Sequence, residues 1–176
     1  MTQQVAIRQD ELLLAFKQAT QELITVLTAF DQDQVNSIPS TGGWTAGQVG
    51  EHLFKSDSAI LNTLYGPVKE TTREPDEYVD NINGQFLDFS TKMQAPDLII
   101  PAYDVYHDKP TLIMALKSNR DLIGNAIQSL DLSLTCTDPV LSDIVGEWTR
   151  QEYINFVISH THRHIHQLKN IHKNLQ

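Results

Sequence analysis

The sequence has little cysteine and few basic residues. Its one cysteine, Cys136, cannot form an internal disulfide, and 13 basic residues are outnumbered by 22 acidic ones, giving a formal net charge of −9. A chain without a disulfide framework is typical of the cytoplasm, where a lone thiol is most simply an inert buried side chain. The deficit of basic residues argues against a nucleic-acid backbone or an anionic membrane as the main partner.

Long apolar runs and a cleavable leader are missing as well. No stretch approaches the roughly 20 apolar residues of a membrane-spanning helix. The N-terminal MTQQVAIRQDELLLAF has neither the basic region nor the small-residue cleavage site of a signal peptide. We therefore expect a cytoplasmic protein with no membrane partner. Its 176 residues are most simply one domain over residues 1–176, large enough to bury a core.

Strand-like alternation is weak, whereas helical periodicity is clear in four segments. Apolar residues fall on one stripe of a helix between about Asp10 and Phe30, and comparable helices are expected near 45–65, 110–130 and 149–172. The connection 66–109 is too long to lack structure in a compact domain, so a short helix is expected within DEYVDNINGQFLDF (76–89). The pattern predicts an all-α protein.

The second helix has a well-marked start and end. Thr45 can cap it, and Gln48 three residues later completes a capping box. Trp44 precedes the cap and Val49 occupies the fourth helical position, an arrangement that predicts a hydrophobic staple. The Gly-Pro pair at 66–67 ends the helix.

The fourth helix repeats this pattern. Thr149 can cap it, Glu152 completes the capping box, and Trp148 can pack on Tyr153. Both tryptophans thus have a structural explanation, which we favour over stacking on a substrate. The third helix is expected to begin near Pro110, since proline suits the first turn of a helix.

The fourth helix carries the segment HTHRHIH, residues 160–166. Since a helix turns about 100° per residue, His160 and His164 share its apolar stripe, whereas His162 and His166 fall on the opposite side. The latter pair is expected to be solvated. Two imidazoles on a core stripe need partners, because an unpaired buried polar group is costly.

Two explanations for the inward pair remain open on the residues alone. Each ring can be satisfied by a buried carboxylate or carbonyl, or the two can share a metal ion, because the i,i+4 spacing points both at one site. A metal needs a further ligand, and His52 on the inner face of the second helix is the better candidate. His107 fits a capping or surface role, and His172 is expected to be solvated.

Two motifs together resemble the DinB-like (YfiT-like) superfamily. They are WTAGQVGEHL at 44–53 and HTHRHIHQL at 160–168. The resemblance implies a four-helix bundle of up-down-down-up topology, with a long connection between helices 2 and 3. It also implies a metal held by His52, His160 and His164. Arg163 and Gln167 match the pattern without being ligands, so a surface salt bridge and hydrogen bonding along the helix are expected of them.

Three neutral imidazoles would leave a divalent ion with open coordination positions for water or a substrate atom. Zinc and nickel are favoured, with iron and copper as alternatives, whereas magnesium and calcium do not suit nitrogen ligands. The resemblance suggests that the substrate is a small molecule. The first enzyme class that it suggests is a thiol-dependent transferase, in which the metal activates a low-molecular-weight thiol. A metal-assisted hydrolase comes second.

Other classes of function stay open at this point. The chain could be a non-catalytic bundle that binds a metal or small ligand, or a metal-free bundle with hydrogen-bonded core histidines, and either could form a homodimer. No general acid or base is assigned, because capping or solvated roles suit Glu51, Glu147 and Glu152 better. Aromatic residues of the long connection are expected to form the pocket walls: Phe86, Phe89, Tyr103 and Tyr106.

Overall fold

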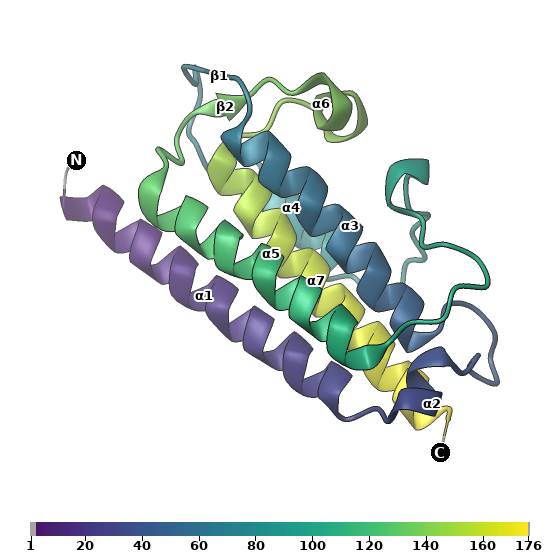
Figure 1. Cartoon of the computed structure of the whole chain (residues 1–176). Coiled ribbons are helices and arrows are strands. Elements are labelled where there is room, and N and C mark those ends of the chain that lie inside the picture. The colour runs from purple at the N-terminus through teal and green to yellow at the C-terminus, as the bar shows by residue number, and fades with distance from the viewer. Residues whose placement is uncertain (1–2, 176) are drawn as a thin grey trace.

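Four long helices dominate the computed structural model, which describes residues 3–175, with side chains from residue 9 onward (Figure 1). They are α1 (Gln3–Thr28), α3 (Ala46–Tyr65), α5 (Lys109–Ser129) and α7 (Arg150–Lys173). The shorter elements are α2 (Gln32–Asn36), α4 (Val79–Phe86), the 3₁₀ turn η1 (Asp97–Ile99), α6 (Pro139–Val145), and the strands β1 (Val68–Lys69) and β2 (Thr135–Cys136). The predicted all-α class is confirmed.

Helices α3 and α5 run parallel. Near their starts, Gly50 lies against the Leu112 side chain, and further along, Asp57 pairs with Arg120. Two consecutive parallel helices require the chain to return between them, which explains why the connection from 66 to 108 is long.

Helix α1 runs antiparallel to α5 and parallel to α7. The Gln9 side chain donates to the backbone oxygen of Ile127, and at the other end Lys109 Nζ donates to the backbone oxygen of Phe30, 2.6 Å away. Figure 1 shows α1 and α7 running from the β1–β2 end of the bundle to the end with α2 and the C-terminus. The topology is therefore up-down-down-up, as the family resemblance implied.

Both predicted capping boxes are present. The side chain of Thr45 accepts from the backbone N–H of Gln48, the Gln48 side chain accepts from the backbone of Thr45, and Thr149 and Glu152 make the same reciprocal pair. The Trp148 ring packs against Tyr153 at a centroid distance of 5.4 Å. These local contacts fix where the two helices that carry the histidines begin.

Several short elements were not predicted. Helix α1 begins seven residues before Asp10, and α2, α6 and the β1–β2 pair have no periodic pattern, because each spans too few residues to show one. The strands are antiparallel, with Val68 opposite Cys136. Burial raises the pKa of the Cys136 thiol to about 11, so this thiol is protonated at neutral pH, as expected of a structural cysteine.

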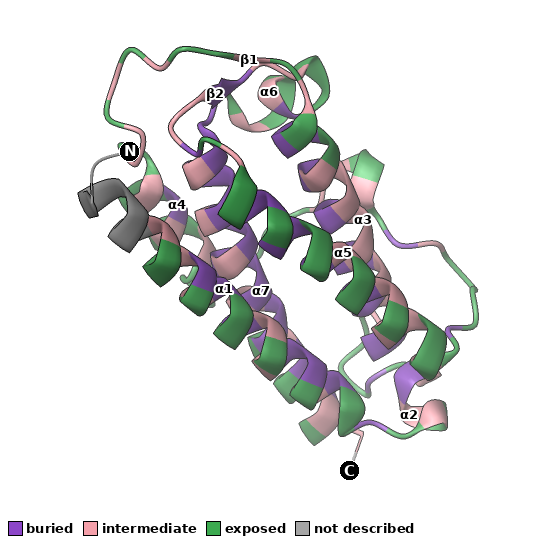
Figure 2. Cartoon of the chain, turned by 60° about the vertical axis from the view of Figure 1, so that its left-hand side comes forward, coloured by how far each residue is buried: buried purple, intermediate pink, exposed green. Residues whose placement is uncertain are grey.

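A buried ion pair separates two apolar clusters in the core. Arg120 Nε lies 2.9 Å from Asp57 Oδ2, and the two side chains are 1% and 2% exposed. The guanidinium also donates to the hydroxyls of Thr20 and Thr161, so the network joins all four long helices. Figure 2 shows the buried residues along the inward faces of these helices.

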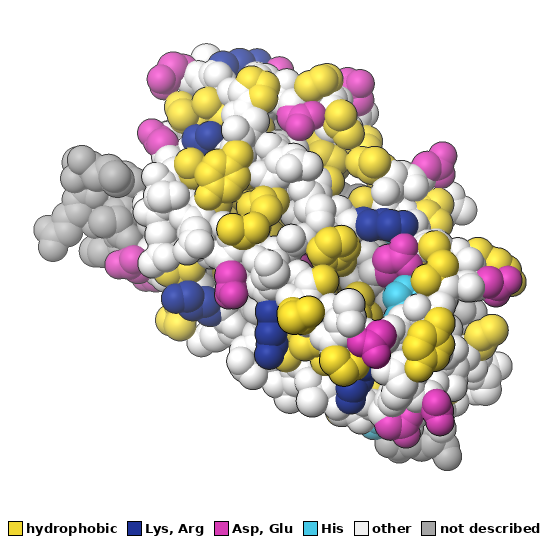
Figure 3. Space-filling model, in the orientation of Figure 1, with side chains coloured by type: hydrophobic (Ala, Val, Ile, Leu, Met, Phe, Trp, Pro, Cys, Tyr) yellow, Lys and Arg dark blue, Asp and Glu magenta, His cyan; other side chains and the backbone are white. Residues whose placement is uncertain are grey.

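The outer surface carries mixed charge. On the face shown in Figure 3, the Lys and Arg side chains of the described residues lie scattered among Asp and Glu. Within residues 3–175, no helix is both long and apolar enough to cross a membrane.

Removing one partner of the buried ion pair should strongly destabilise the protein. We expect Asp57→Ala to lower the free energy of unfolding by about 3–5 kcal/mol, because Arg120 is left buried without a counter-charge. The double variant Asp57→Leu, Arg120→Met should lose clearly less. Urea unfolding measures both. Lys169→Ala, which breaks the exposed pair with Glu22, is the control and should cost less than about 1 kcal/mol. If Asp57→Ala and Lys169→Ala lowered the free energy of unfolding equally, the buried pair of Asp57 and Arg120 would not contribute more than an exposed pair, contrary to the prediction.

Candidate metal centre

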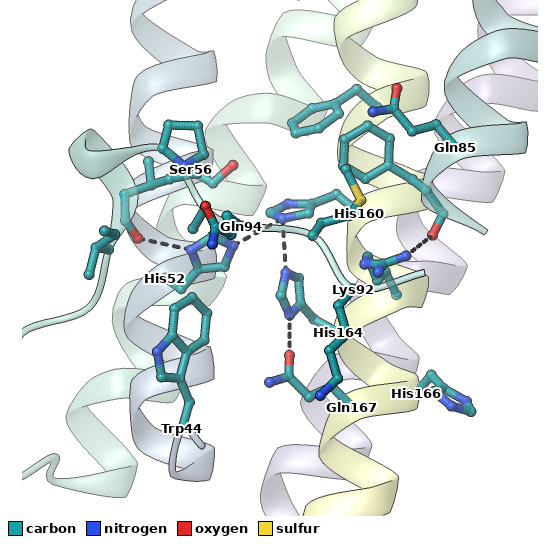
Figure 4. A pocket seen from close by; sticks show the side chains of 18 of the residues that line it. Trp44, His52, Ser56, Gln85, Lys92, Gln94, His160, His164, His166 and Gln167 are labelled. Carbon is teal, nitrogen blue, oxygen red and sulfur yellow. Dashed lines mark hydrogen bonds between the residues drawn. The ribbon is translucent and has the colours of Figure 1, made fainter. Parts of the chain in front are cut away.

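Three histidines from two helices converge inside the bundle. His160 Nε2 lies 3.0 Å from His52 Nε2 and 2.9 Å from His164 Nε2, and one ligand nitrogen of each ring lies within 4.8 Å of the others. All three residues are buried. Figure 4 shows the rings of α3 and α7 pointing toward one another. The structure thus brings together the three residues that the sequence singled out.

Two of the rings, those of His52 and His164, are oriented by hydrogen bonds at Nδ1, the nitrogen that does not face the other histidines. His52 Nδ1 lies 2.9 Å from the backbone oxygen of Ile99, and His164 Nδ1 lies 2.8 Å from Gln167 Oε1. Since both partners are acceptors, we assign the ring proton to Nδ1 in each case, which leaves a lone pair on each Nε2. Gln167 was expected only to hydrogen-bond along the helix, but its amide holds a ring of the cluster.

This arrangement of donors fits a cation. Two Nε2 lone pairs face the same nitrogen of His160, and one proton there can form a good hydrogen bond to only one of them. A metal ion accepts all three lone pairs, and Zn–N bonds of about 2.0–2.1 Å in tetrahedral geometry need the nitrogens roughly 3.3 Å apart, a few tenths of an ångström more than the 3.0 and 2.9 Å of the two pairs that include His160. The donor set therefore suits a transition metal better than a network of hydrogen bonds.

Burial keeps the imidazoles neutral, which is the form that binds metals. It lowers the pKa of His52, lowers that of His160 well below its ordinary value, and, with the charge of His52 as a second cause, lowers that of His164 to about 3. At neutral pH the cluster presents nitrogen lone pairs rather than positive charges.

Aromatic rings surround the cluster. Phe156 stacks on His160 with centroids 5.0 Å apart, and Trp44 lies 5.0 Å from the His52 ring. Trp44 was expected only to act as a staple, but it also lines the cavity in front of the cluster, as does Trp148. These contacts restrict the rotamers of the histidines.

The three rings form part of the wall of a cavity of about 1060 Å³. Its walls come from α3, α6, α7, the loop 39–44 and the connection 85–100. Phe86 and Phe89 line it as predicted, but Tyr103 and Tyr106 do not and are 86% and 67% exposed. The cavity is large enough for a small-molecule substrate.

Arg163 holds the connection in place over α7. Its guanidinium donates to the backbone oxygens of Phe86, Asp88 and Thr91, the second at 2.8 Å. The expectation of a surface salt bridge was therefore wrong, because the partners are carbonyl groups of a distant segment. Arg163 thereby positions a part of the chain that lines the cavity.

The remaining histidines lie outside the cluster. His162 is 40% exposed and 3.9 Å from Glu22, as expected of a solvated residue. His166 is exposed and points away from the three rings in Figure 4, but it stacks on Phe89 at a centroid distance of 4.5 Å. His172 is half-buried and packs edge-on against Phe30, so its ring is partly solvated.

His107 also differs from expectation, since it is 8% exposed and not a surface residue. Its Nε2 lies 2.8 Å from Glu51 Oε2 and donates to that carboxylate. Glu51 further accepts from the backbone of Ala102 and pairs with Lys55, so it is fully engaged. No local pattern predicts this pair, because its members are 56 residues apart.

The other two carboxylates considered from sequence are engaged as well. Glu152 is fully buried and accepts two 2.6 Å hydrogen bonds from Arg73, besides closing its capping box. Glu147 pairs with Lys69. Neither carboxylate lies among the residues that line the cavity.

Comparison with known proteins agrees with the fold. A sequence model described as the DinB superfamily matches residues 15–168. The protein YuaE of Bacillus subtilis (strain 168) is 26% identical over 169 residues, which cover 92% of this chain and 97% of YuaE. Among solved structures, YfiT from Bacillus subtilis, described as a probable metal-dependent hydrolase with an unusual four-helix bundle topology, matches with a TM-score of 0.60 at 13% identity. The match covers 99% of this chain and 90% of that one.

Loss of the Arg163 guanidinium should loosen the connection. In Arg163→Ala we expect amide hydrogen exchange of residues 86–92 to become at least tenfold faster, because the carbonyl groups of this segment lose their partner. Exchange in α5 should not change. Mass spectrometry of peptides measures both regions, and Lys117→Ala on α5 serves as the control. Unchanged exchange at 86–92 would show that Arg163 does not hold the segment.

Proposed function

The chain belongs to the DinB superfamily, and from this premise we propose that it is a metal-dependent enzyme acting on a small molecule, with His52, His160 and His164 as the metal ligands. The observation that carries the proposal is the convergence of three neutral imidazoles on the wall of a cavity of about 1060 Å³. If the protein binds a metal ion from one side only, the remaining coordination positions of the ion would face the cavity. Such open positions are typical of catalytic metal sites and not of structural ones.

Zinc and nickel suit three imidazole nitrogens best, with iron and copper as alternatives. A divalent metal held there would lower the pKa of a bound thiol or water toward neutrality. The chain's own residues hold the rings: Ile99 and Gln167 accept from His52 and His164, and Phe156 stacks on His160.

We propose transfer of a low-molecular-weight thiol to an electrophile as the first reaction class. Among the described residues that line the cavity, Asp97 is the only one with a carboxylate. Glu51, Glu147 and Glu152 lie outside the cavity wall and are paired with other residues. With a single carboxylate, the site suits chemistry that needs no separate general base. A thiol bound to a divalent metal would release its proton to solvent and would attack the electrophile as a thiolate, with the leaving group departing as an anion. Lys92, which has no polar partner among the described residues, lines the same cavity and offers a charge for an anionic group of the thiol.

Metal-assisted hydrolysis is the second reaction class. It is favoured by one observation, the fold shared with YfiT, which is described as a probable metal-dependent hydrolase. In this chain Asp97 would be the carboxylate available to a hydrolytic water, from the cavity wall formed by residues 85–100.

Metal content tests the ligand assignment. Untagged protein purified without chelator or nickel resin should contain about one equivalent of a transition metal by elemental analysis. His164→Ala should lose it, because one of the three nitrogens is missing, whereas His162→Ala should keep it. The control carries the same substitution two residues away on the exposed side of α7. Equal loss in both variants, or no metal even after zinc or nickel is added, would contradict the assignment.

Turnover separates an enzyme from a binding protein. Metal-loaded protein should accelerate the conjugation of a carboxylate-bearing thiol such as cysteine with an aryl halide, and His164→Ala should lose at least 100-fold of this rate. A panel of ester and amide substrates tests hydrolysis in parallel. Stoichiometric metal with no turnover in either panel would instead indicate a non-catalytic metal-binding bundle.

A further inference from the structure

One buried polar side chain in the cavity wall has no partner in the contacts described above. Among the described residues, and apart from tryptophan and tyrosine, the buried polar residues that line the cavity are the three histidines and Ser56. Ser56 is 4% exposed, and its hydroxyl has no hydrogen-bond partner within the described part of the chain. A buried hydroxyl without a partner is costly, so this serine needs an explanation.

The hydroxyl of Ser56 is open to the cavity. Among the described residues that are not exposed, only two unpaired side-chain N or O atoms are completely enclosed, and neither belongs to a serine. Since Ser56 Oγ is unpaired and is not one of these two atoms, it retains accessible surface. His52, Ser56, Ala59 and Ile60 all line the cavity, so this face of α3 forms part of its wall. Figure 4 shows Ser56 beside His52 on the side of α3 that faces α7.

A free hydroxyl is unusual for a serine inside a helix. Serine and threonine at such positions commonly donate to the carbonyl group four residues earlier. Ser58 donates in this way to the Phe54 oxygen at 2.8 Å, and Thr161 donates to the Val157 oxygen at 2.6 Å. Ser56 makes no such bond, so its proton remains available to a bound molecule.

Helix geometry places this hydroxyl next to the histidine cluster. Ser56 follows His52 by four residues, so it lies about one turn, or 6 Å, further along α3 and points in nearly the same direction. Since α3 and α7 are antiparallel, the same step leads along α7 from His160 to Phe156, whose rings stack on each other. The Ser56 donor therefore lies where the imidazoles give way to the aromatic part of the wall.

We infer that Ser56 is a further catalytic residue, whose hydroxyl donates a hydrogen bond to an oxygen of the electrophile that becomes negative as the thiol attacks. The class of electrophile is an apolar epoxide, whose ring oxygen is attached to the carbon that reacts. This inference rests on the proposed function for the thiol and the histidines, and it names the class of the second substrate.

The reaction balances with the groups available. The thiolate sulfur forms a bond to one ring carbon, the bond from that carbon to the oxygen breaks, and its electron pair remains on the oxygen. The resulting alkoxide takes a proton from solvent, which replaces the proton that the thiol released. Ser56 is unchanged at the end, because its hydroxyl only stabilises the charge that develops on the oxygen. A fixed donor aimed at developing negative charge favours the transition state over the bound substrate.

The accessibility of this position is tested without a metal. In Ser56→Cys, methyl methanethiosulfonate should modify the introduced thiol at least about tenfold faster than Cys136 of the wild type, which is 1% exposed and has its pKa raised to about 11 by burial. Ser159→Cys is the matched control, because Ser159 is 2% exposed but does not line the cavity. Mass spectrometry measures each rate. Equally slow modification of both variants would overturn the inference.

Turnover of two matched electrophiles tests the hydrogen bond. Styrene oxide and phenethyl bromide both present a phenyl group and a terminal reacting carbon, but only the first develops charge on oxygen. In metal-loaded protein with cysteine as the thiol, Ser56→Ala should lower kcat about 100-fold for styrene oxide, the loss typical of one oxyanion donor, and less than about threefold for phenethyl bromide. Ser56→Thr should restore most of the lost rate, because it returns the hydroxyl. Ser58→Ala, which removes a hydroxyl bonded to Phe54, should leave both rates unchanged.

The outcomes for Ser56 and for the metal are separable. Equal losses for the two electrophiles in Ser56→Ala, styrene oxide turnover that survives this substitution, or turnover of phenethyl bromide alone would overturn the inference and leave the proposed function intact. Metal-loaded protein that converts neither electrophile would overturn the catalytic role of Ser56. Absence of bound metal would overturn the proposed function and, with it, the role of Ser56 in the reaction.

Discussion

The mutual approach of three buried imidazole rings is the interaction on which the surrounding structure depends. Nitrogens of His52, His160 and His164 lie about as close as hydrogen-bonded atoms, and all three residues are buried. Such a cluster is unfavourable unless each ring nitrogen has a partner. Ile99 and Gln167 supply partners for the outer nitrogens of His52 and His164, and the inner nitrogens of all three rings lie close together.

The long connection between α3 and α5 follows from topology and is used to build the site. Two consecutive parallel helices need a return segment along the bundle. This segment supplies the Ile99 backbone oxygen to His52, and Arg163 of α7 holds the middle of the segment through three carbonyl groups. A feature required by helix direction therefore also orients a candidate ligand and forms one wall of the cavity.

Charge is neutralised in pairs away from the cavity. Asp57 and Arg120 pair between α3 and α5, Glu152 pairs with Arg73, and Glu51 accepts from His107. Each pair satisfies a carboxylate that would otherwise be buried at high cost. Among the described residues that line the cavity, Asp97 is consequently the one with a carboxylate.

The sequence by itself determined the helical class, the capped starts of α3 and α7, and which face of α7 carries His160 and His164. These features depend on residues three or four positions apart, whose geometry a helix fixes locally. Only the tertiary structure decided that Arg163 binds carbonyl groups, that His107 is buried against Glu51, and that Tyr103 and Tyr106 are exposed and do not line the cavity. Their partners are far away in sequence, and the path of an irregular connection has no period from which to predict it.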